Sequence, residues 1–405
     1  MNNTLSKDLA IRPEYLGTPQ LLAPFVHHTS SQRGMMYSSH LSQALVLDGA
    51  EQPRIMTGYE KVIGNYEITS CRVEQDMIIR KILPKYNPLN YREKAGLEIP
   101  EWCVIYVGQE DGKVHCMDIR RYTLLHDGFG YFNQMHGFDD DLLFEGSLIQ
   151  KGTKLTSSPA HSGNKYMMGM NARVAFMSEW GVTEDAFIVS KSLAAKGGNT
   201  AIQQVKLNIG LDTMPLDLYG QGGNYKCFPS IGETVREDGA LIALRNISKS
   251  TYVQDMTPSA LRNIEHIHDE VHRAPPGSKI LDVDVYINTE AARKLKDVHN
   301  FQQFFDLEQC HRWQQDEIIA AYEQLCVKEG LPCAPEFNTR FVREATLSAN
   351  KKYCKKQHVH LYDAREPIEF ITVIITYAYK RTITVGSKLT GREGKFIASS
   401  YRNVG

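Results

Sequence analysis

FITVIITYAY, residues 370–379, and ITVGSKLTGREGKFIAS, residues 383–399, together decide how this chain is interpreted. The first stretch is rich in β-branched and aromatic residues, and it is half the length needed to cross a bilayer, so it predicts a buried strand. The second stretch places Lys388, Arg392 and Lys395 among three glycines that permit tight turns. Backbone N–H groups and lysines in such a loop can hold phosphate oxygens, although a solvated turn with surface cations is the competing interpretation. The spacing does not match a P-loop.

The composition is that of an ordinary globular protein. The chain has 405 residues, 42% of them hydrophobic and 23% charged, with a formal net charge of −1. Any contact with nucleic acid therefore needs a local concentration of cations. Its eight cysteines form no C-x-x-C pair, and its first residues lack the apolar core of a signal peptide. Both features predict free thiols in a reducing cytoplasm.

The hydrophobic pattern changes period once along the chain. Short strands bounded by turn residues are predicted at NARVAFM 171–177, AFIVS 186–190 and KILDVDVYI 279–287. Helices are predicted over about 289–328, where Ile318, Tyr322 and Leu325 recur at helical spacing and Gly330 with Pro332 ends the pattern. A helical insertion within a β-rich body follows from this change.

Two further segments carry candidate polar groups. In 168–193, two predicted strands flank Glu184 and Asp185, and adjacent carboxylates at a strand mouth attract hydrated Mg²⁺ or a metal-bound triphosphate. An exposed acid pair in a turn is the common alternative. In the otherwise compact segment 24–45, polar residues interrupt the apolar ones: His28, Gln32, Arg33, Ser39 and Gln43. Arginine and glutamine here suit a phosphate or a ribose edge, and the alternative is that they are ordinary residues of a helix surface.

HDEVH at 268–272 suggests a different class of protein. His268 and His272 have the i, i+4 spacing of zinc ligands on a helix, but Asp269 stands where the metalloprotease pattern needs glutamate. A stand-alone metallohydrolase is therefore kept only as a minor alternative.

Three of the segments described above resemble, in their order along the chain, the β subunit of multisubunit DNA-directed RNA polymerase. They are 24–45, 168–193 and 383–399. The segment 24–45 is similar to P-F-x-x-H-x-x-x-x-R-x-x-M, the segment 168–193 to G-x-N-x-R-x-A-x-M…E-D, and the end of the chain to G-D-K-x-A-G-R-H-G-N-K. The match departs at the end, where Ser387 replaces an acid, Glu393 replaces histidine, and Lys395 aligns only with a one-residue deletion.

The resemblance implies a predominantly β, α+β fold built on a double-psi β-barrel. The expected parts are a barrel segment at 1–66, a β-rich module at 67–150, a barrel segment with the Glu-Asp loop at 151–205, a flap-like insertion at 206–368, and a barrel segment at 369–405.

The resemblance also implies roles for individual residues in nucleotidyl transfer. Lys388 and Lys395 are expected at the phosphates of the RNA 3′ end, and Arg33 at the NTP triphosphate. Glu184 and Asp185 are expected beside the second Mg²⁺ without ligating metal directly, because the partner β′ subunit holds the principal Mg²⁺. The residues expected to contact nucleic acid are Gln43, His28, Arg392 and Ser39.

The resemblance covers only part of a β subunit. It implies partners: another β fragment, β′ chains, a promoter-recognition or initiation factor, template DNA, the RNA product and NTPs, and no membrane. A split β subunit like those of giant tailed bacteriophages is expected, located in the cytoplasm of an infected bacterial host or packaged in the virion. The alternative within this family is a polymerase-derived scaffold or DNA-clamp subunit without a catalytic contribution.

Overall fold

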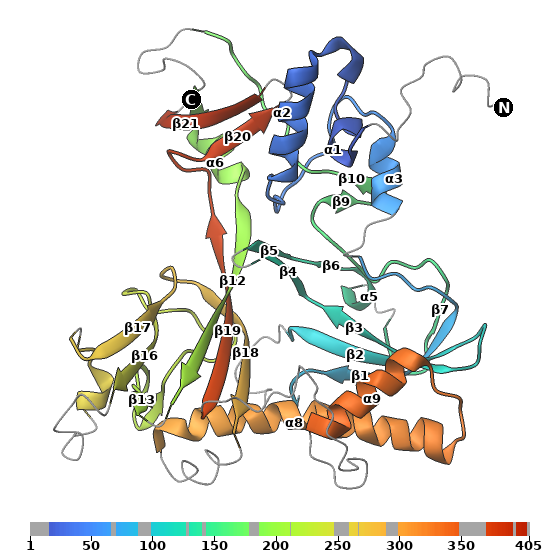
Figure 1. The fold of residues 1–405 in the computed structure, drawn as a ribbon, viewed down its shortest axis with the longest axis vertical. Coiled ribbons are helices and arrows are strands. Elements are labelled where there is room, and N and C mark those ends of the chain that lie inside the picture. The colour runs from blue at the N-terminus through green and yellow to red at the C-terminus, as the bar shows by residue number, and fades with distance from the viewer. Residues whose placement is uncertain are drawn as a thin grey trace. The chain divides into compact units, whose positions relative to one another are not determined.

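The computed structural model shows a chain made mainly of β-strands with some helices (Figure 1). It describes residues 16–65, 70–87, 99–126, 129–139, 143–177, 186–210, 212–246, 259–265, 267–288, 299–347, 370–391 and 394–402. The chain divides into two compact units. Unit 1 takes 1–70, 157–200 and 380–405, and unit 2 takes 71–156 and 201–379.

The first sheet of unit 2 has the strand order β3-β2-β1-β7. Its bounds are β1 Met77–Pro84, β2 Glu101–Gly108, β3 Val114–Arg120 and β7 Leu148–Ile149. Successive side chains of β2 point to opposite faces, and both faces are covered. Trp102 and Val104 pack in one hydrophobic cluster, whereas Cys103 and Ile105 pack in another. A strand buried on both sides explains why its sequence, EWCVIYVG, is almost continuously apolar.

The second sheet of unit 2 has the order β12-β19-β18. These strands are β12 Asn199–Ile209, β18 Lys279–Ile287 and β19 Ile371–Arg381. The predicted strands at 279–287 and 370–379 are therefore confirmed. They pair with each other in antiparallel register, with Val283 opposite Ile375, and both residues are fully buried in the largest hydrophobic cluster.

The third sheet has the order β13-β16-β17, with bounds β13 Thr213–Pro215, β16 Ala240–Asn246 and β17 Asp269–Arg273. A hairpin of β14 Tyr219–Gln221 and β15 Asn224–Lys226 follows β13. In β16, Arg245 is 1% exposed and donates from Nε and Nη2 to the Asp269 carboxylate, at 2.6 and 2.7 Å. Burial of a charged side chain is tolerated here because a bidentate partner accompanies it.

A long helix joins two of these sheets. Helix α8, Gln302–Tyr322, continues as a π-helical turn, Glu323–Lys328, and the chain then turns at Gly330 with φ +71°. Near its start Phe304 packs with the second sheet, and near its end Ile318 packs against the first sheet. The helix predicted in this region is confirmed over 302–328, whereas 289–298 lie outside the described residues. Helix α9, Pro335–Leu347, was not predicted and packs on α8 and β3.

A buried polar cluster also ties β1 to β18. Lys85 lies directly after β1, and its Nζ is 2.6 Å from Asp282 Oδ2 and 2.8 Å from Asp284 Oδ1. Burial opposes the charge on Lys85, but the two carboxylates outweigh it and raise its pKa well above the ordinary value. Tyr122 Oη donates to Asp282 at 3.1 Å.

Unit 1 is built from segments far apart in the sequence. Its helices are α1 Thr18–Leu21, η2 Val26–His28, α2 Ser31–Ser42, α3 Tyr59–Asn65 and α6 Lys191–Lys196. Its strands are β9 His161–Ser162, β10 Lys165–Tyr166, β11 Ala186–Ser190, β20 Lys388–Gly391 and β21 Gly394–Arg402. One sheet has the order β11-β21-β20. The strand predicted at 186–190 is confirmed, and the double-psi β-barrel stays a prediction.

One predicted strand of unit 1 is wrong. Residues 171–177 form neither strand nor helix, and their side chains are exposed, Phe176 by 94% and Met177 by 69%. The alternation in NARVAFM resembles a strand, but no described neighbour supplies a ladder or a covering layer, and a strand without them has little to stabilise it.

The remaining elements are short. They are β4 Tyr122–His126, β5 Phe129–Phe132, β6 Gln134–Met135, α5 His136–Asp139, β8 Thr156–Ser157, η5 Ala260–Arg262 and η6 His299–Phe301. No helix in the described ranges has the length and apolar character required for a membrane span.

Candidate active site

A tight turn sets the position of Lys388. Ser387 N–H donates to Thr384 O at 2.9 Å, and Gly386, the third residue of the turn, has φ +89°. This is the geometry of a type II turn, which requires glycine at that place. Ser387 Oγ accepts from Thr384 N at 2.9 Å. A carboxylate, the group that the polymerase pattern has at this position, could accept the same bond.

The strand after the turn presents Lys388 to solvent. Leu389 packs against the small core formed by Val189, Ala194 and Ile383, and successive side chains of a strand alternate in direction. Lys388 and Thr390 accordingly lie on the other face and are exposed. In the β20–β21 ladder, Lys395 stands opposite Thr390.

The β11 strand brings the second segment to the same sheet. It pairs in parallel with β21, and Ala186 stands opposite Ile397. Ile397 is also the partner of Lys388 on the other side. Ala186 and Lys388 are thus two strand spacings apart, about 10 Å between backbones.

Helix α2, which carries the first segment, lies against β20 and β21 (Figure 1). Ser30 caps its first turn, with Oγ accepting from Arg33 N at 3.4 Å. Arg33 is exposed on this first turn, where the helix dipole favours anions. Ser39 lies on the same helix, Gln43 forms its C-cap, and His28 ends the preceding 3₁₀ turn. All three are exposed.

The stretch 57–60, which leads into helix α3, is held by its own hydrogen bonds. Glu60, which is buried, accepts from the backbone N–H groups of Thr57 at 3.0 Å and Gly58 at 2.8 Å, the two residues before α3, and so fixes the turn that leads into this helix. Burial, with a smaller effect from the Glu60 carboxylate, raises the pKa of Tyr37 on α2. The conformation of this stretch is therefore set by bonds between its own backbone and the Glu60 side chain.

Glu51, which follows the first segment in the chain, contacts residues of the second segment. Its backbone N–H donates to Gly169 O at 2.7 Å, and its carboxylate accepts from Asn171 N at 2.9 Å and forms an ion pair with Lys196. The bond from Lys196, followed by the backbone bond from Asn171, lowers the pKa of Glu51 to about 2. A few residues earlier, Asp48 accepts from Thr200 N at 3.1 Å and Thr200 Oγ1 at 2.7 Å.

Several predicted site residues cannot be placed. Glu184, Asp185 and Arg392 lie outside the described residues, and Lys395 is described only by its backbone. Among the predicted residues, the structure brings the elements bearing Arg33, Ser39 and Lys388 together.

Within the described ranges, one group of three residues has metal-ligand geometry: Asp282, Asp284 and His311, whose ligand atoms lie within 4.8 Å of one another. This group belongs to unit 2, and the Lys85 ammonium already supplies the cation between the two carboxylates. The alternative zinc site at His268 and His272 is wrong in its geometry, because 269–273 is strand β17 and the i, i+4 spacing of a helix does not apply.

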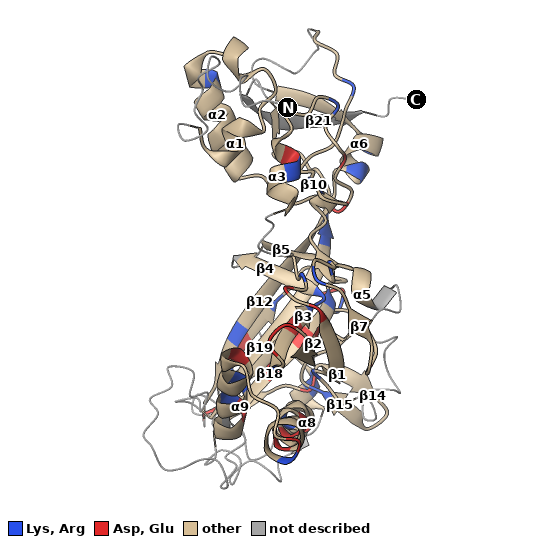
Figure 2. Cartoon of the chain, turned by 90° about the vertical axis from the view of Figure 1, so that its right-hand side faces the viewer, with Lys and Arg blue, Asp and Glu red and all other residues tan. Residues whose placement is uncertain are grey.

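Charged groups of unit 1 are spread over several elements. Figure 2 shows basic residues on α2, α3 and α6, and an acidic residue beside the base on α3. The charged side chains of unit 1 therefore come from separate segments of the chain.

Comparisons with known proteins agree with the resemblance at a distance. The chain is 26% identical to the DNA-directed RNA polymerase subunit β of Thermus aquaticus over 182 residues, which are 45% of this chain and 14% of that subunit. It is 23% identical to the subunit β of Cyanidioschyzon merolae over 291 residues, which are 67% of this chain and 25% of that subunit. No protein-family model matches. The chain is distantly related to polymerase β subunits and spans a quarter or less of the length of these relatives.

Sequence reasoning missed the residues that hold the site together. Asp48, Glu51 and Lys196 carry no local signal, because their partners are far away in the sequence. Asn171 is 120 positions from Glu51, and Thr200 is 152 positions from Asp48. Only the folded chain reveals these contacts.

Proposed function

We propose that this chain is part of the β subunit of a multisubunit DNA-directed RNA polymerase and forms one wall of the centre that polymerises NTPs. One observation carries the proposal. The segments with polymerase-like motifs, 24–45, 168–193 and 383–399, are remote in sequence, yet all belong to unit 1, and the α2 helix of the first lies against the β20–β21 hairpin of the third. The distant relation to β subunits supports the same function.

Lys388 is the central residue of this proposal. It is exposed, it follows a turn held by Ser387 and Gly386, and its side chain makes no described ion pair, so its ammonium is available to a phosphate. Arg33 lies on a helix that packs against the same hairpin, and its guanidinium suits a triphosphate. In nucleotidyl transfer such groups position the reactants and stabilise the negative charge that develops as the 3′-hydroxyl attacks the α-phosphate.

Mg²⁺ would reach this centre mainly through another chain. The ion stabilises charge on the attacking and leaving oxygens. The metal-like group in the described part of unit 2 does not fit this role, because Lys85 neutralises it. In the proposal a β′ chain holds the principal Mg²⁺. Glu184 and Asp185, which directly precede β11, contribute negative charge beside the second, NTP-borne ion.

Four residues are proposed to contact the nucleic acids. Gln43, Ser39 and His28 are exposed on or beside α2, and Arg392 belongs to the two-residue connection between β20 and β21. Amide, hydroxyl and guanidinium donors are suited to phosphate and sugar oxygens, which position a strand without reading its sequence.

Unit 1 also requires partners for stability. In its described part the buried apolar residues are few and mostly small: Ala23, Ala160, Val189, Ala194 and Ile383. In contrast, Met35, Ile55 and Phe176 are more than half exposed. Such an apolar surface with a small core is typical of a fragment completed by other chains. We assign that role to another β fragment and to β′ chains, with an initiation factor completing the complex. A bacteriophage origin, with the complex made in the infected cell or packaged in the virion, is part of the same proposal.

The test is nucleotide addition by the assembled complex. Lys388→Ala should lower the rate of single-nucleotide addition at saturating NTP by roughly 100-fold, which is the usual effect of losing one charge-stabilising group. The matched control is Lys191→Ala, an exposed lysine on α6 of the same unit. Both variants should assemble normally. Equal rates for the two variants would reject the role of Lys388 and favour a scaffold or DNA-clamp subunit.

A further inference from the structure

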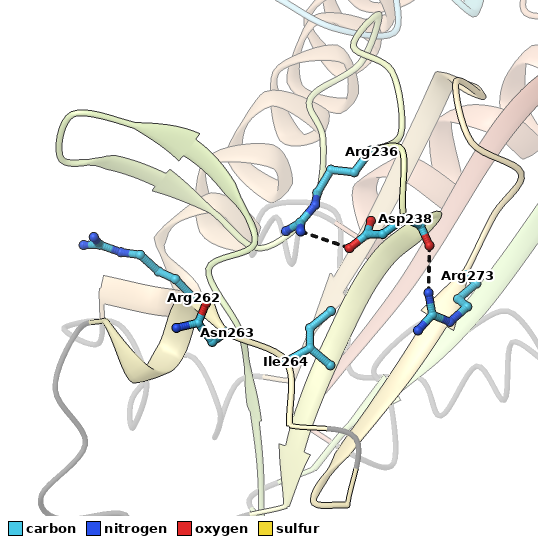
Figure 3. A pocket seen from close by; sticks show the side chains of 6 residues that line it. All are labelled: Arg236, Asp238, Arg262, Asn263, Ile264 and Arg273. Carbon is cyan, nitrogen blue, oxygen red and sulfur yellow. Dashed lines mark hydrogen bonds and ion pairs between the residues drawn. The ribbon is translucent and has the colours of Figure 1, made fainter.

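A pocket lined by arginines lies in unit 2, apart from the three polymerase-like segments, which belong to unit 1. It has a volume of about 340 Å³ and opens beside the β13-β16-β17 sheet (Figure 3). Its lining residues are Arg236, Asp238, Arg262, Asn263, Ile264 and Arg273.

Each guanidinium of the pocket is held in place by the protein. Arg236 donates to Asp238 Oδ2 at 2.9 Å and to Leu218 O at 3.0 Å. Arg273 donates to the backbone carbonyl of Asp238 at 2.7 Å. Arg262 lies over the ring of Tyr225, 3.5 Å from its centroid, in a cation–π contact. A guanidinium has five N–H donors, so each of the three retains donors for a ligand.

The wall that carries Arg262 is also fixed. The buried Arg245 donates to Ala260 O at 3.3 Å and Asn263 O at 3.1 Å, and its partner Asp269 accepts from the backbone N–H of Glu265 at 2.7 Å. The segment 259–265 is thus anchored to the sheet by Arg245 of β16 and Asp269 of β17. A preorganised wall loses little entropy when a ligand binds.

The charges around the pocket indicate the class of ligand. Three arginines and one carboxylate line the pocket, in a chain whose formal net charge is −1, so the lining carries a local excess of positive charge. Figure 3 shows that Arg262 extends away from Arg236 and Arg273, with Asp238 between the latter two. A single phosphate would call for convergent donors. Donors distributed along a wall suit a ligand whose negative charges repeat.

We propose that this pocket binds the sugar–phosphate backbone of a nucleic-acid strand, with the three arginines contacting successive phosphates. Backbone contacts of this kind give affinity that does not depend on base sequence and that falls with salt. RNA and DNA share the phosphate chemistry, and the experiment distinguishes them. The site does not depend on any role of Lys388.

The test measures binding of the full chain to labelled oligonucleotides of about 20 nucleotides, as single-stranded RNA, single-stranded DNA and duplex DNA, over about 50 to 200 mM salt. The double variant Arg262→Gln/Arg273→Gln should bind about 3- to 10-fold more weakly. It should also show a slope of log affinity against log salt that is shallower by about 1.4 for single strands.

The matched control is Arg120→Gln/Arg312→Gln. These two arginines are also in unit 2 and exposed, by 63% and 59%, and each has one carboxylate partner. The control should bind as the unchanged chain does. Equal loss in both double variants, or no loss in the pocket variant, would overturn the proposal. Displacement of the oligonucleotide by polyglutamate at equal charge concentration would also overturn it, in favour of an acidic protein partner.

A second measurement needs no variant. Phenylglyoxal modifies accessible arginines, and mass spectrometry locates the modified positions. Bound oligonucleotide should protect Arg262 and Arg273 and leave Arg120 and Arg312 reactive. Equal reactivity of all four with and without oligonucleotide would contradict the proposal. Neither readout involves catalysis, so failure here is distinguishable from failure of the polymerase function.

Discussion

Replacing Arg245 by methionine should destabilise unit 2 strongly. The change removes two charge-assisted hydrogen bonds to Asp269, at 2.6 and 2.7 Å, and two bonds to the carbonyls of Ala260 and Asn263. The Asp269 side chain is 0% exposed and would keep an unpaired charge in the interior. Breaking a buried pair from one side costs about 3–5 kcal/mol, a large share of the 5–15 kcal/mol that stabilises a typical domain.

The measurement is urea unfolding followed by tryptophan fluorescence, combined with hydrogen exchange over residues 259–273. Arg245→Met should lower the free energy of unfolding by the amount above and speed exchange of the Glu265 amide, which loses its fixed acceptor. The double variant Arg245→Met/Asp269→Leu should recover much of the loss, because no charge remains buried. A single variant within about 1 kcal/mol of the unchanged chain would refute the reasoning.

Two further predictions concern unit 1. The pKa of Glu51 is lowered to about 2, so its bonds stabilise the fold above its ordinary value of 4.5 and are lost as the pH falls from there towards 2. The melting temperature of Glu51→Gln should therefore lie below that of the unchanged chain at pH 6, and the gap should close near pH 2. A gap that does not depend on pH would contradict this. Gly64→Ala should cost about 1–3 kcal/mol, because the new Cβ would lie 2.4 Å from Asn164 O and push α3 off β10. Gly49→Ala, which meets nothing within 4 Å, is the control, and equal melting temperatures would count against this packing.

Local signals in the sequence predicted the strands and the helix whose apolar residues are buried in the core. The strands β18 and β19 are rich in β-branched residues and the helix α8 has regular apolar spacing, and each buries the residues that the pattern selects, such as Val283, Ile375 and Ile318. Prediction was wrong at 171–177, where the same alternation has no described neighbour to pack on. Helix α9 was missed, although proline at its first position and Glu336 in its first turn are signals of a helix start.

For the candidate site too, the sequence indicated some residues and gave no sign of others. Motif order and glycine spacing selected Arg33 and Lys388, and the type II turn at Gly386 explains why glycine stands there. Asn171 is a position of the polymerase-like motif, but the sequence contained no signal that it contacts Glu51, or that Glu51 contacts Lys196, because these residues lie far apart along the chain.

The sequence by itself determined the periodic elements, the glycine turns and the resemblance to polymerase β subunits, because these depend on neighbouring residues. Only the tertiary structure decided that α2 packs on the β20–β21 hairpin, that Arg245 pairs with Asp269 in the interior, and that Arg236, Arg262 and Arg273 line one pocket. Such contacts form when folding brings distant segments within a few ångströms. Their partners are chosen by burial and charge in three dimensions, and a linear pattern does not record that choice.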